Sequence, residues 1–128
     1  MDYVTDTHSI ICYFTEDSRL REIALNALEG TIREGVVIIP SVVLAEIMFI
    51  SRKGRITLTF EESLRKIEEY ENIHIAPLDV EILKIADKIA VNMEMHDRLI
   101  VATALHFEAT LITKDPFIRE TGACLTLW

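Results

Sequence analysis

The sequence predicts an α/β fold with a central, largely parallel sheet of about five strands and helices on both faces. First, short runs of β-branched residues alternate with segments whose apolar residues recur at helical spacing. Second, residues 36–39 are apolar at every position, which is typical of a strand covered on both faces. Third, the chain has 128 residues, so we expect one domain over 1–128.

The composition is that of a folded, acidic protein. Half of the residues are hydrophobic and the mean hydropathy is +0.26, so a sizeable core can form. The net charge of −8 argues against a protein whose whole surface binds nucleic acid. Two cysteines, Cys12 and Cys124, without zinc-site spacing favour a reducing compartment. No signal peptide or membrane-length apolar run is visible, so we expect a cytoplasmic protein without a membrane partner.

The N-terminal segment predicts one strand and two helices. Residues 3–5 form a β-rich run that ends at Asp6, and residues 7–14 follow as a helix. Residues 18–29 carry apolar side chains at i, i+3 and i+4, which indicates a second helix with Ser18 as its cap. Gly30 and Gly35 then indicate a loop or a frayed helix end.

The middle of the chain continues the alternation. The strand over 36–39 is closed by Pro40, and Ser41 is placed to cap a helix over 42–51 that Gly54 can end. Thr59 and Glu62 have the spacing of a capping box for a helix over 60–70.

The C-terminal half predicts three more strands and two more helices. Residues 72–76, 109–113 and 124–128 are the strands. Asp79 begins one helix, and the other lies behind Asp97.

The helix behind Asp97 is apolar on almost every side, so we expect it to be buried. Asp97 stands where an N-cap would stand, which is the simpler interpretation of this acid. The alternative is a metal ligand held near the positive end of the helix dipole.

Four acids from distant parts of the sequence are predicted to meet at one edge of the sheet. Asp6 and Asp115 follow the first and fourth strands, Glu46 lies in the helix after the second strand, and Asp97 begins the helix before the fourth. Crossover helices start at the carboxyl edge of a parallel sheet, where ligands of such folds bind. Topology alone therefore places these carboxylates on one rim.

Taken singly, these acids have simpler explanations. Asp6 can cap the following helix, and Asp115 before Pro116 is a common turn sequence. Glu46 is harder to explain, because it is the one charge within the apolar run 42–50 and a buried carboxylate needs a partner. Clustered carboxylates repel one another unless cations enter, and all-oxygen sites suit Mg²⁺ or Mn²⁺. Such a metal activates water toward phosphates, so phosphodiester hydrolysis is the chemistry expected.

The residues at these positions resemble a known family. Asp6-Thr7 after a strand, the lone Glu46, and the runs 97–104 and 111–115 are similar to PIN-domain ribonucleases, and most of all to VapC-like toxins of type II toxin–antitoxin pairs. The resemblance covers essentially the whole chain. The resemblance implies a PIN-like three-layer fold. It also implies that the protein is a toxin with Mg²⁺-dependent endoribonuclease activity, in which Mn²⁺ can replace Mg²⁺.

The resemblance also implies roles for individual residues. Asp115 matches a fourth, more variable acidic position, and Thr7 and Thr113 match supporting positions. Many relatives carry a further acid where this chain has Phe117, so the sequence leaves open whether the site holds one metal ion or two. The three principal acidic metal-site positions are matched by Asp6, Glu46 and Asp97.

Basic and apolar residues suggest the partners. Arg98, Lys114 and Arg119 lie near the predicted rim and are candidates for contacts with RNA phosphates. In the helices over 42–51 and 60–70, adjacent apolar residues cannot all face one core, so part of this surface can meet a partner. In VapC-like proteins the corresponding region forms a homodimer and receives an antitoxin segment, which we expect here.

Two alternatives remain at this stage. One is a PIN fold that binds RNA without cutting it. The other is a phosphoacceptor receiver domain, with Asp6, Asp79 and Lys114 before Pro116 as its signature. Receivers, however, carry an acidic pair after the first strand and a lysine on the last strand, and they leave Glu46 and the Asp97 helix unexplained.

Overall fold

A parallel five-stranded sheet forms the centre of the computed structural model, which describes residues 2–128. The strand order is β3-β2-β1-β4-β5, and every neighbouring pair is parallel. The predicted fold class is thus confirmed, with β1 at the centre of the sheet. The strands are β1 (Tyr3–Thr5), β2 (Val37–Pro40), β3 (Ile73–Ala76), β4 (Thr110–Ile112) and β5 (Thr126–Leu127).

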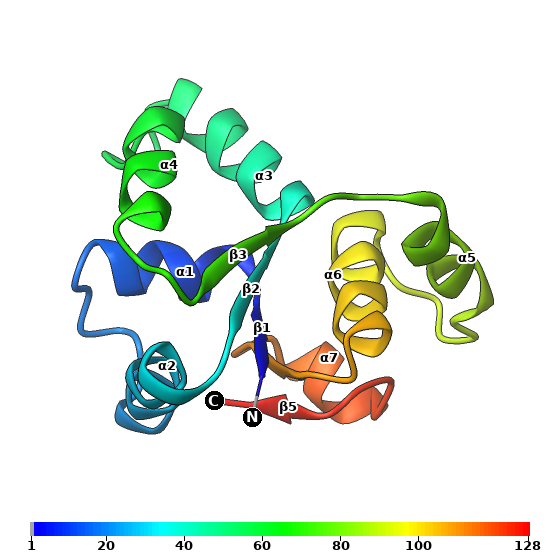
Figure 1. The fold of residues 1–128 in the computed structure, drawn as a ribbon. Helices are drawn as coiled ribbons and strands as arrows, with labels where there is room; N and C mark the ends of the chain where they lie inside the picture. The colour runs from blue at the N-terminus through cyan, green and yellow to red at the C-terminus, as the bar shows by residue number, and fades with distance from the viewer. Residues whose placement is uncertain (1) are drawn as a thin grey trace.

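Helices cover both faces of the sheet and give three layers (Figure 1). Figure 1 shows α1, α2 and α4 on one side of the sheet and α5, α6 and α7 on the other. Helix α3 packs against α1, α4 and α6, so it joins the two sides near the carboxyl edge. The helices are α1 (Thr7–Phe14), α2 (Glu22–Glu34), α3 (Ser41–Arg52), α4 (Phe60–Glu68), α5 (Val80–Lys88), α6 (Met95–His106) and α7 (Pro116–Thr121).

The caps of three helices confirm the sequence-based predictions. The side chains of Asp6, Thr59 and Asp79 accept backbone N–H groups in the first turns of α1, α4 and α5. Gly54 adopts a φ of +71° just after α3, which is the left-handed conformation that ends many helices.

The predicted start of α2 was wrong. The helix begins at Glu22 rather than at Ser18, and it continues through Gly30 to Glu34, with Gly35 as its C-cap. The residues near Ser18 form a turn instead, in which the Asp17 carboxylate accepts hydrogen bonds from the backbone and side chain of Arg19. This local ion pair competes with helix initiation at Ser18.

The predicted cap of α3 was also wrong. Pro40 is the N-cap residue of α3, and Ser41 is the first residue of the helix. The Ser41 hydroxyl accepts a hydrogen bond of 3.0 Å from the Leu78 backbone N–H. Ser41 therefore ties α3 to the segment after β3, a long-range contact that local sequence does not reveal.

The core has two parts. The main cluster joins the inner faces of the sheet and its covering helices, with fully buried Val4, Ile39 and Leu111 among its members. A second cluster packs α5 on α6 through Ile82, Ala86, Leu99 and Ala102. Burial of apolar surface in both clusters is the main favourable contribution to folding. Within residues 2–128, no helix has the length and apolar character needed to cross a membrane.

Candidate active site

The carboxyl edge of the sheet is the natural place for a site. Strand β1 lies between β2 and β4. The strands β2 and β3 therefore lie on one side of β1, and the later strands β4 and β5 lie on the other, so the strand order reverses at β1. In open α/β sheets, ligands bind in the crevice at this switch point. Asp6 follows β1 and Asp115 follows Ile112, the last residue of β4, by three positions. The receiver interpretation needs Asp6 and Asp79 in one site. Asp79, however, follows the edge strand β3, and β2 separates β3 from β1, so the strand order does not favour that interpretation.

Asp6 is half-buried and serves as the N-cap of α1. Its Oδ1 accepts the Ser9 backbone N–H at 2.9 Å, which confirms the simple capping interpretation. Capping engages one carboxylate oxygen, so it is compatible with metal binding by the other. The next residue, Thr7, is buried, and its hydroxyl has no hydrogen-bond partner among residues 2–128. A buried unpaired hydroxyl is costly unless water or a ligand satisfies it.

Asp115 has a helical role that the sequence analysis missed. Its Oδ1 accepts the N–H groups of Phe117 and Ile118 and so caps α7, with Pro116 as the first helical residue. An acid before proline is a helix-start signal as well as a turn signal. The buried Thr113 hydroxyl accepts the Asp115 backbone N–H at 3.1 Å. Thr113 therefore holds the backbone that carries the Asp115 carboxylate.

Asp97 is not the cap of α6, so its predicted cap role was wrong. Glu94 is the N-cap, and its Oε2 accepts the Asp97 backbone N–H at 3.3 Å. Asp97 lies in the first turn, where a negative charge interacts favourably with the helix dipole. Its half-buried carboxylate is therefore not consumed by capping its own helix.

The charge of Asp97 is influenced by the other three predicted acids. Burial, followed by the charges of Asp115, Glu94, Glu46 and Asp6 in that order, raises the pKa of Asp97 to about 6. Glu46 is half-buried on α3, which packs against both α1 and α6. These contributions agree with the packing, because α6 contacts both β1 and α3 and so brings the start of α6 to the edge where β1 ends. Glu94 is a fifth acid at this edge that the sequence analysis missed.

The residue types fit a hard divalent cation. Carboxylate and hydroxyl oxygens are the ligands that Mg²⁺ and Mn²⁺ prefer, and the mutual repulsion of these carboxylates is what a cation relieves. Within residues 2–128, no three His, Cys, Asp or Glu side chains stand close enough to enclose an ion. Mg²⁺ does not require such a cage, because it usually keeps several waters and takes one or two carboxylates. The open arrangement is compatible with this mode of binding.

The three predicted phosphate-binding cations differ in their surroundings. Arg98 donates three hydrogen bonds to backbone carbonyls at the end of α5 and in the connection to α6, so the structure gives it a different role. Lys114 and Arg119 are exposed, at the end of β4 and on α7. Burial lowers the pKa of His8, on α1, and the charge of the Lys114 ammonium lowers it further.

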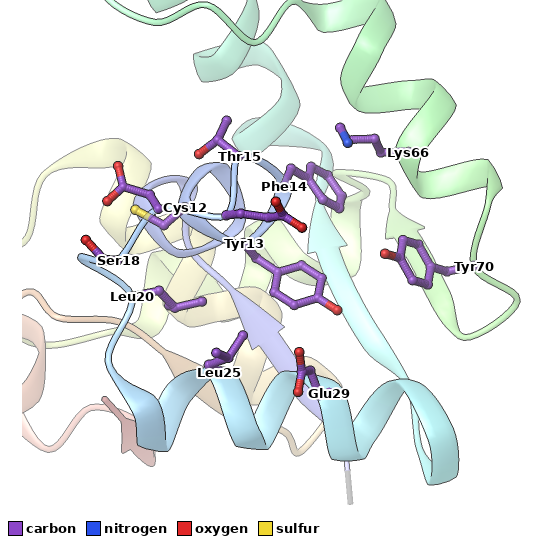
Figure 2. A pocket seen from close by; sticks show the side chains of 12 residues that line it. Cys12, Tyr13, Phe14, Thr15, Ser18, Leu20, Leu25, Glu29, Lys66 and Tyr70 are labelled. Carbon is purple, nitrogen blue, oxygen red and sulfur yellow. The ribbon is translucent and has the colours of Figure 1, made fainter.

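A cavity of about 680 Å³ lies elsewhere, between α1, α2 and α4 (Figure 2). Figure 2 shows Tyr13 and Tyr70 extending toward one another, with Glu29 and Lys66 nearby. Burial raises the pKa of Tyr13 to about 12, and the phenol of Tyr70 contributes to this shift. None of the four rim acids lines this cavity, so it is separate from the candidate active site.

Comparisons with known proteins agree with this geometry. The PIN domain family model matches residues 3–123. Ribonuclease VapC1 of Thermoplasma acidophilum is 32% identical over 133 residues, which cover 99% of this chain and 56% of the relative. The chain thus spans little more than half the length of that protein.

Solved structures share the fold at low sequence identity. VapBC2 of Rickettsia felis, bound to a promoter DNA fragment, matches 99% of this chain and 98% of its own, with a TM-score of 0.76 and 17% identity. VapBC-1 of nontypeable Haemophilus influenzae matches 99% and 97%, with a TM-score of 0.68 and 23% identity. VapC20 of Mycobacterium tuberculosis matches 94% and 95%, with a TM-score of 0.62 and 13% identity. Together with the family match over nearly the whole chain, these findings show that the protein belongs to the PIN-domain family.

Proposed function

We propose that this protein is a metal-dependent endoribonuclease that hydrolyses RNA phosphodiester bonds. The observation that carries the proposal is the raised pKa of Asp97 beside the switch point of a parallel sheet, a shift to which the charges of Asp115, Glu46 and Asp6 contribute. The similarity to Ribonuclease VapC1 supports the reaction, and the M. tuberculosis relative is described as a toxin that cleaves the sarcin–ricin loop. The single domain over 1–128 and a cytoplasmic location, where RNA and a reducing environment coincide, are part of this proposal.

Each acid has a distinct part in the proposed site. Asp6 and Asp97 would hold the first metal ion, Glu46 would complete the site or orient the attacking water, and Asp115 would act through water or a second ion. A bound Mg²⁺ or Mn²⁺ supplies a Lewis acid for the phosphate and lowers the pKa of its water. Thr113 supports Asp115 through the hydrogen bond to its backbone N–H.

Two groups would assist RNA at the rim. Lys114 is exposed just after β4, and its charge acts on His8 of α1, so its ammonium can contact a phosphate next to the scissile bond. Arg119 on α7 is a second, more distant candidate. On a chain with a net charge of −8, such local cations determine where a polyanion can approach.

Substitution of Asp6 by asparagine tests the proposed reaction. Asparagine caps helices about as well as aspartate, so the Asp6→Asn variant should retain α1 and fold normally. Its loss of negative charge should lower RNA cleavage in Mn²⁺ by about 10²–10³-fold, the range for losing one preorganised electrostatic group. Cleavage of a fluorescently labelled RNA and thermal denaturation measure the two effects.

Asp79→Asn is a matched control, because Asp79 also caps a helix through its Oδ1 but lies outside the rim. It should cut RNA like the wild-type chain. Wild-type cleavage by Asp6→Asn would show that the measured nuclease activity does not come from this site. A wild-type chain that binds RNA but cuts none in Mn²⁺ would favour the alternative of a silent RNA-binding PIN fold.

We further propose that the protein is a toxin controlled by an antitoxin. Several structural relatives are described as VapBC or toxin–antitoxin complexes. The cavity between α1, α2 and α4 borders the region expected to receive an antitoxin segment, and its lining combines apolar, phenolic and charged groups. A small protein encoded beside this chain that abolishes cleavage on mixing would support the proposal, whereas no such neighbour would argue against it.

A homodimer is proposed from the exposed apolar residues of α3. Met48 and Phe49 are 39% and 56% exposed, on a helix that also contributes to the main core. Burial of such side chains between two copies is favourable. Light scattering after size-exclusion chromatography should give twice the chain mass at micromolar concentration, and Phe49→Lys should reduce it to the monomer. A wild-type monomer at this concentration would contradict the dimer.

A further inference from the structure

The Arg98 guanidinium is tied to the end of α5. Its Nη1 donates to the carbonyl oxygens of Ala86 and Ile89, and its Nη2 donates to that of Val91, each at 2.9 Å. The last carbonyls of a helix have no partners within it, and they give that end a partial negative charge. The guanidinium therefore satisfies and neutralises this end while reaching into the connection to α6.

The same connection determines the backbone position of Asp97. Glu94 caps α6 by accepting the Asp97 backbone N–H, and its carbonyl accepts the Arg98 backbone N–H at 2.9 Å. Asp97 thus lies between the cap of α6 and the residue whose side chain ties that helix to α5. Hydrogen bonds fix both ends of the segment 86–98.

Packing of α5 on α6 is a separate interaction. It rests on the second core cluster, in which Ile82 and Ala86 of α5 meet Leu99 and Ala102 of α6. Helix α5 can therefore keep an apolar contact with α6 when the guanidinium is removed. The hydrogen-bonded connection and the apolar contact can be weakened one at a time.

We propose that Arg98 is a positioning residue for the active site, which fixes the first turn of α6 and with it the Asp97 carboxylate relative to Asp6 and Glu46. This inference rests on the proposed function, because the residue that Arg98 positions is a ligand of the proposed metal site. Arginine suits the role since two nitrogens of a rigid planar group reach three carbonyls at once. A lysine has one nitrogen and can replace only part of this arrangement.

The test compares Arg98→Ala, Arg98→Lys and Ile82→Ala with the wild-type chain. Mn²⁺ binding to the RNA-free protein is measured by the electron paramagnetic resonance of free Mn²⁺, beside thermal denaturation and RNA cleavage. Removing a group that orients metal ligands typically weakens metal binding about 10–100-fold, which is the result expected for Arg98→Ala. Arg98→Lys should be intermediate. Ile82→Ala should melt at a lower temperature but bind Mn²⁺ with unchanged affinity.

Two results would overturn the inference. One is wild-type Mn²⁺ affinity in Arg98→Ala, and the other is an equal loss of affinity in Ile82→Ala, which would mean that any loosening of α5 suffices. If Arg98→Ala does not fold, Arg98→Lys against Ile82→Ala provides the same comparison. If the wild-type chain binds no Mn²⁺, the proposed metal site itself fails and the role of Arg98 fails with it.

Discussion

Asp97→Asn should abolish RNA cleavage and at the same time make the metal-free protein more stable at neutral pH. The activity should fall by about 10²–10³-fold or more, because the variant loses a charge that holds the cation. The stability gain follows from the neighbours of Asp97, since burial and four other acids disfavour its charged form. A neutral amide of similar shape removes that repulsion. RNA cleavage and urea denaturation in EDTA measure the two effects.

The pH dependence of this gain has a defined sign. The pKa of Asp97 is about 6 in the folded chain against an ordinary value of 3.8, so between these pH values the folded state binds more protons. Wild-type stability should therefore fall, relative to the variant, as pH rises from about 4 to 6, and the difference should vanish below 3.8. Asp87→Asn, on the exposed face of α5, is the control and should show no such pattern. An Asp97→Asn variant that is less stable in EDTA at pH 7.5 would contradict the predicted repulsion.

Removal of divalent cations should have the second large effect. EDTA should reduce cleavage to background, and Mg²⁺ or Mn²⁺ should restore it, because the carboxylates alone cannot stabilise the added charge of the transition state. A cation that binds only the folded chain also stabilises it, by about 2.7 kcal/mol at 100 times its Kd. Thermal denaturation with and without Mn²⁺ should show this shift in the wild-type chain and not in Asp97→Asn.

Glu34→Gln provides the control for non-specific charge effects. Glu34 is an exposed acid at the end of α2, just before the amino end of β2 and so away from the carboxyl edge, and its loss should leave the Mn²⁺ shift unchanged. Full cleavage in EDTA would contradict a metal-dependent reaction. An equal Mn²⁺ shift in Asp97→Asn would mean that the ion binds outside the rim.

The sheet and its topology could be predicted because the central strands are short runs of β-branched, aromatic and leucine residues, followed by cap or turn residues. Residues 36–39, for example, combine apolar character at every position with a closing proline, and the structure places β2 over Val37–Pro40. Parallel connections then required the acids after β1 and β4 to face the same edge. The convergence of Asp6 and Asp115 follows from that topology without any knowledge of side-chain packing.

Local hydrogen bonds that compete with one another could not be predicted. Glu94 and Asp97 are two acids near the start of one helix, and the sequence does not show that Glu94 is the cap and accepts the Asp97 N–H. Helix α7 was missed because its six residues are too few to show a periodic pattern. Arg98 was predicted to contact RNA because it lies near the predicted rim, whereas its partners in the structure are carbonyls seven to twelve residues earlier in the chain.

A crystal structure of the wild-type chain grown with Mn²⁺, with anomalous scattering data collected for the ion, tests the central claim most directly. The account predicts an anomalous peak beyond the carboxyl end of β1, with oxygens of Asp6 and Asp97 within about 2.0–2.2 Å, as hard divalent cations require. Glu46 should face the same ion directly or through a water. A peak bound elsewhere, or a Glu46 carboxylate that faces away from Asp6 and Asp97, would contradict it.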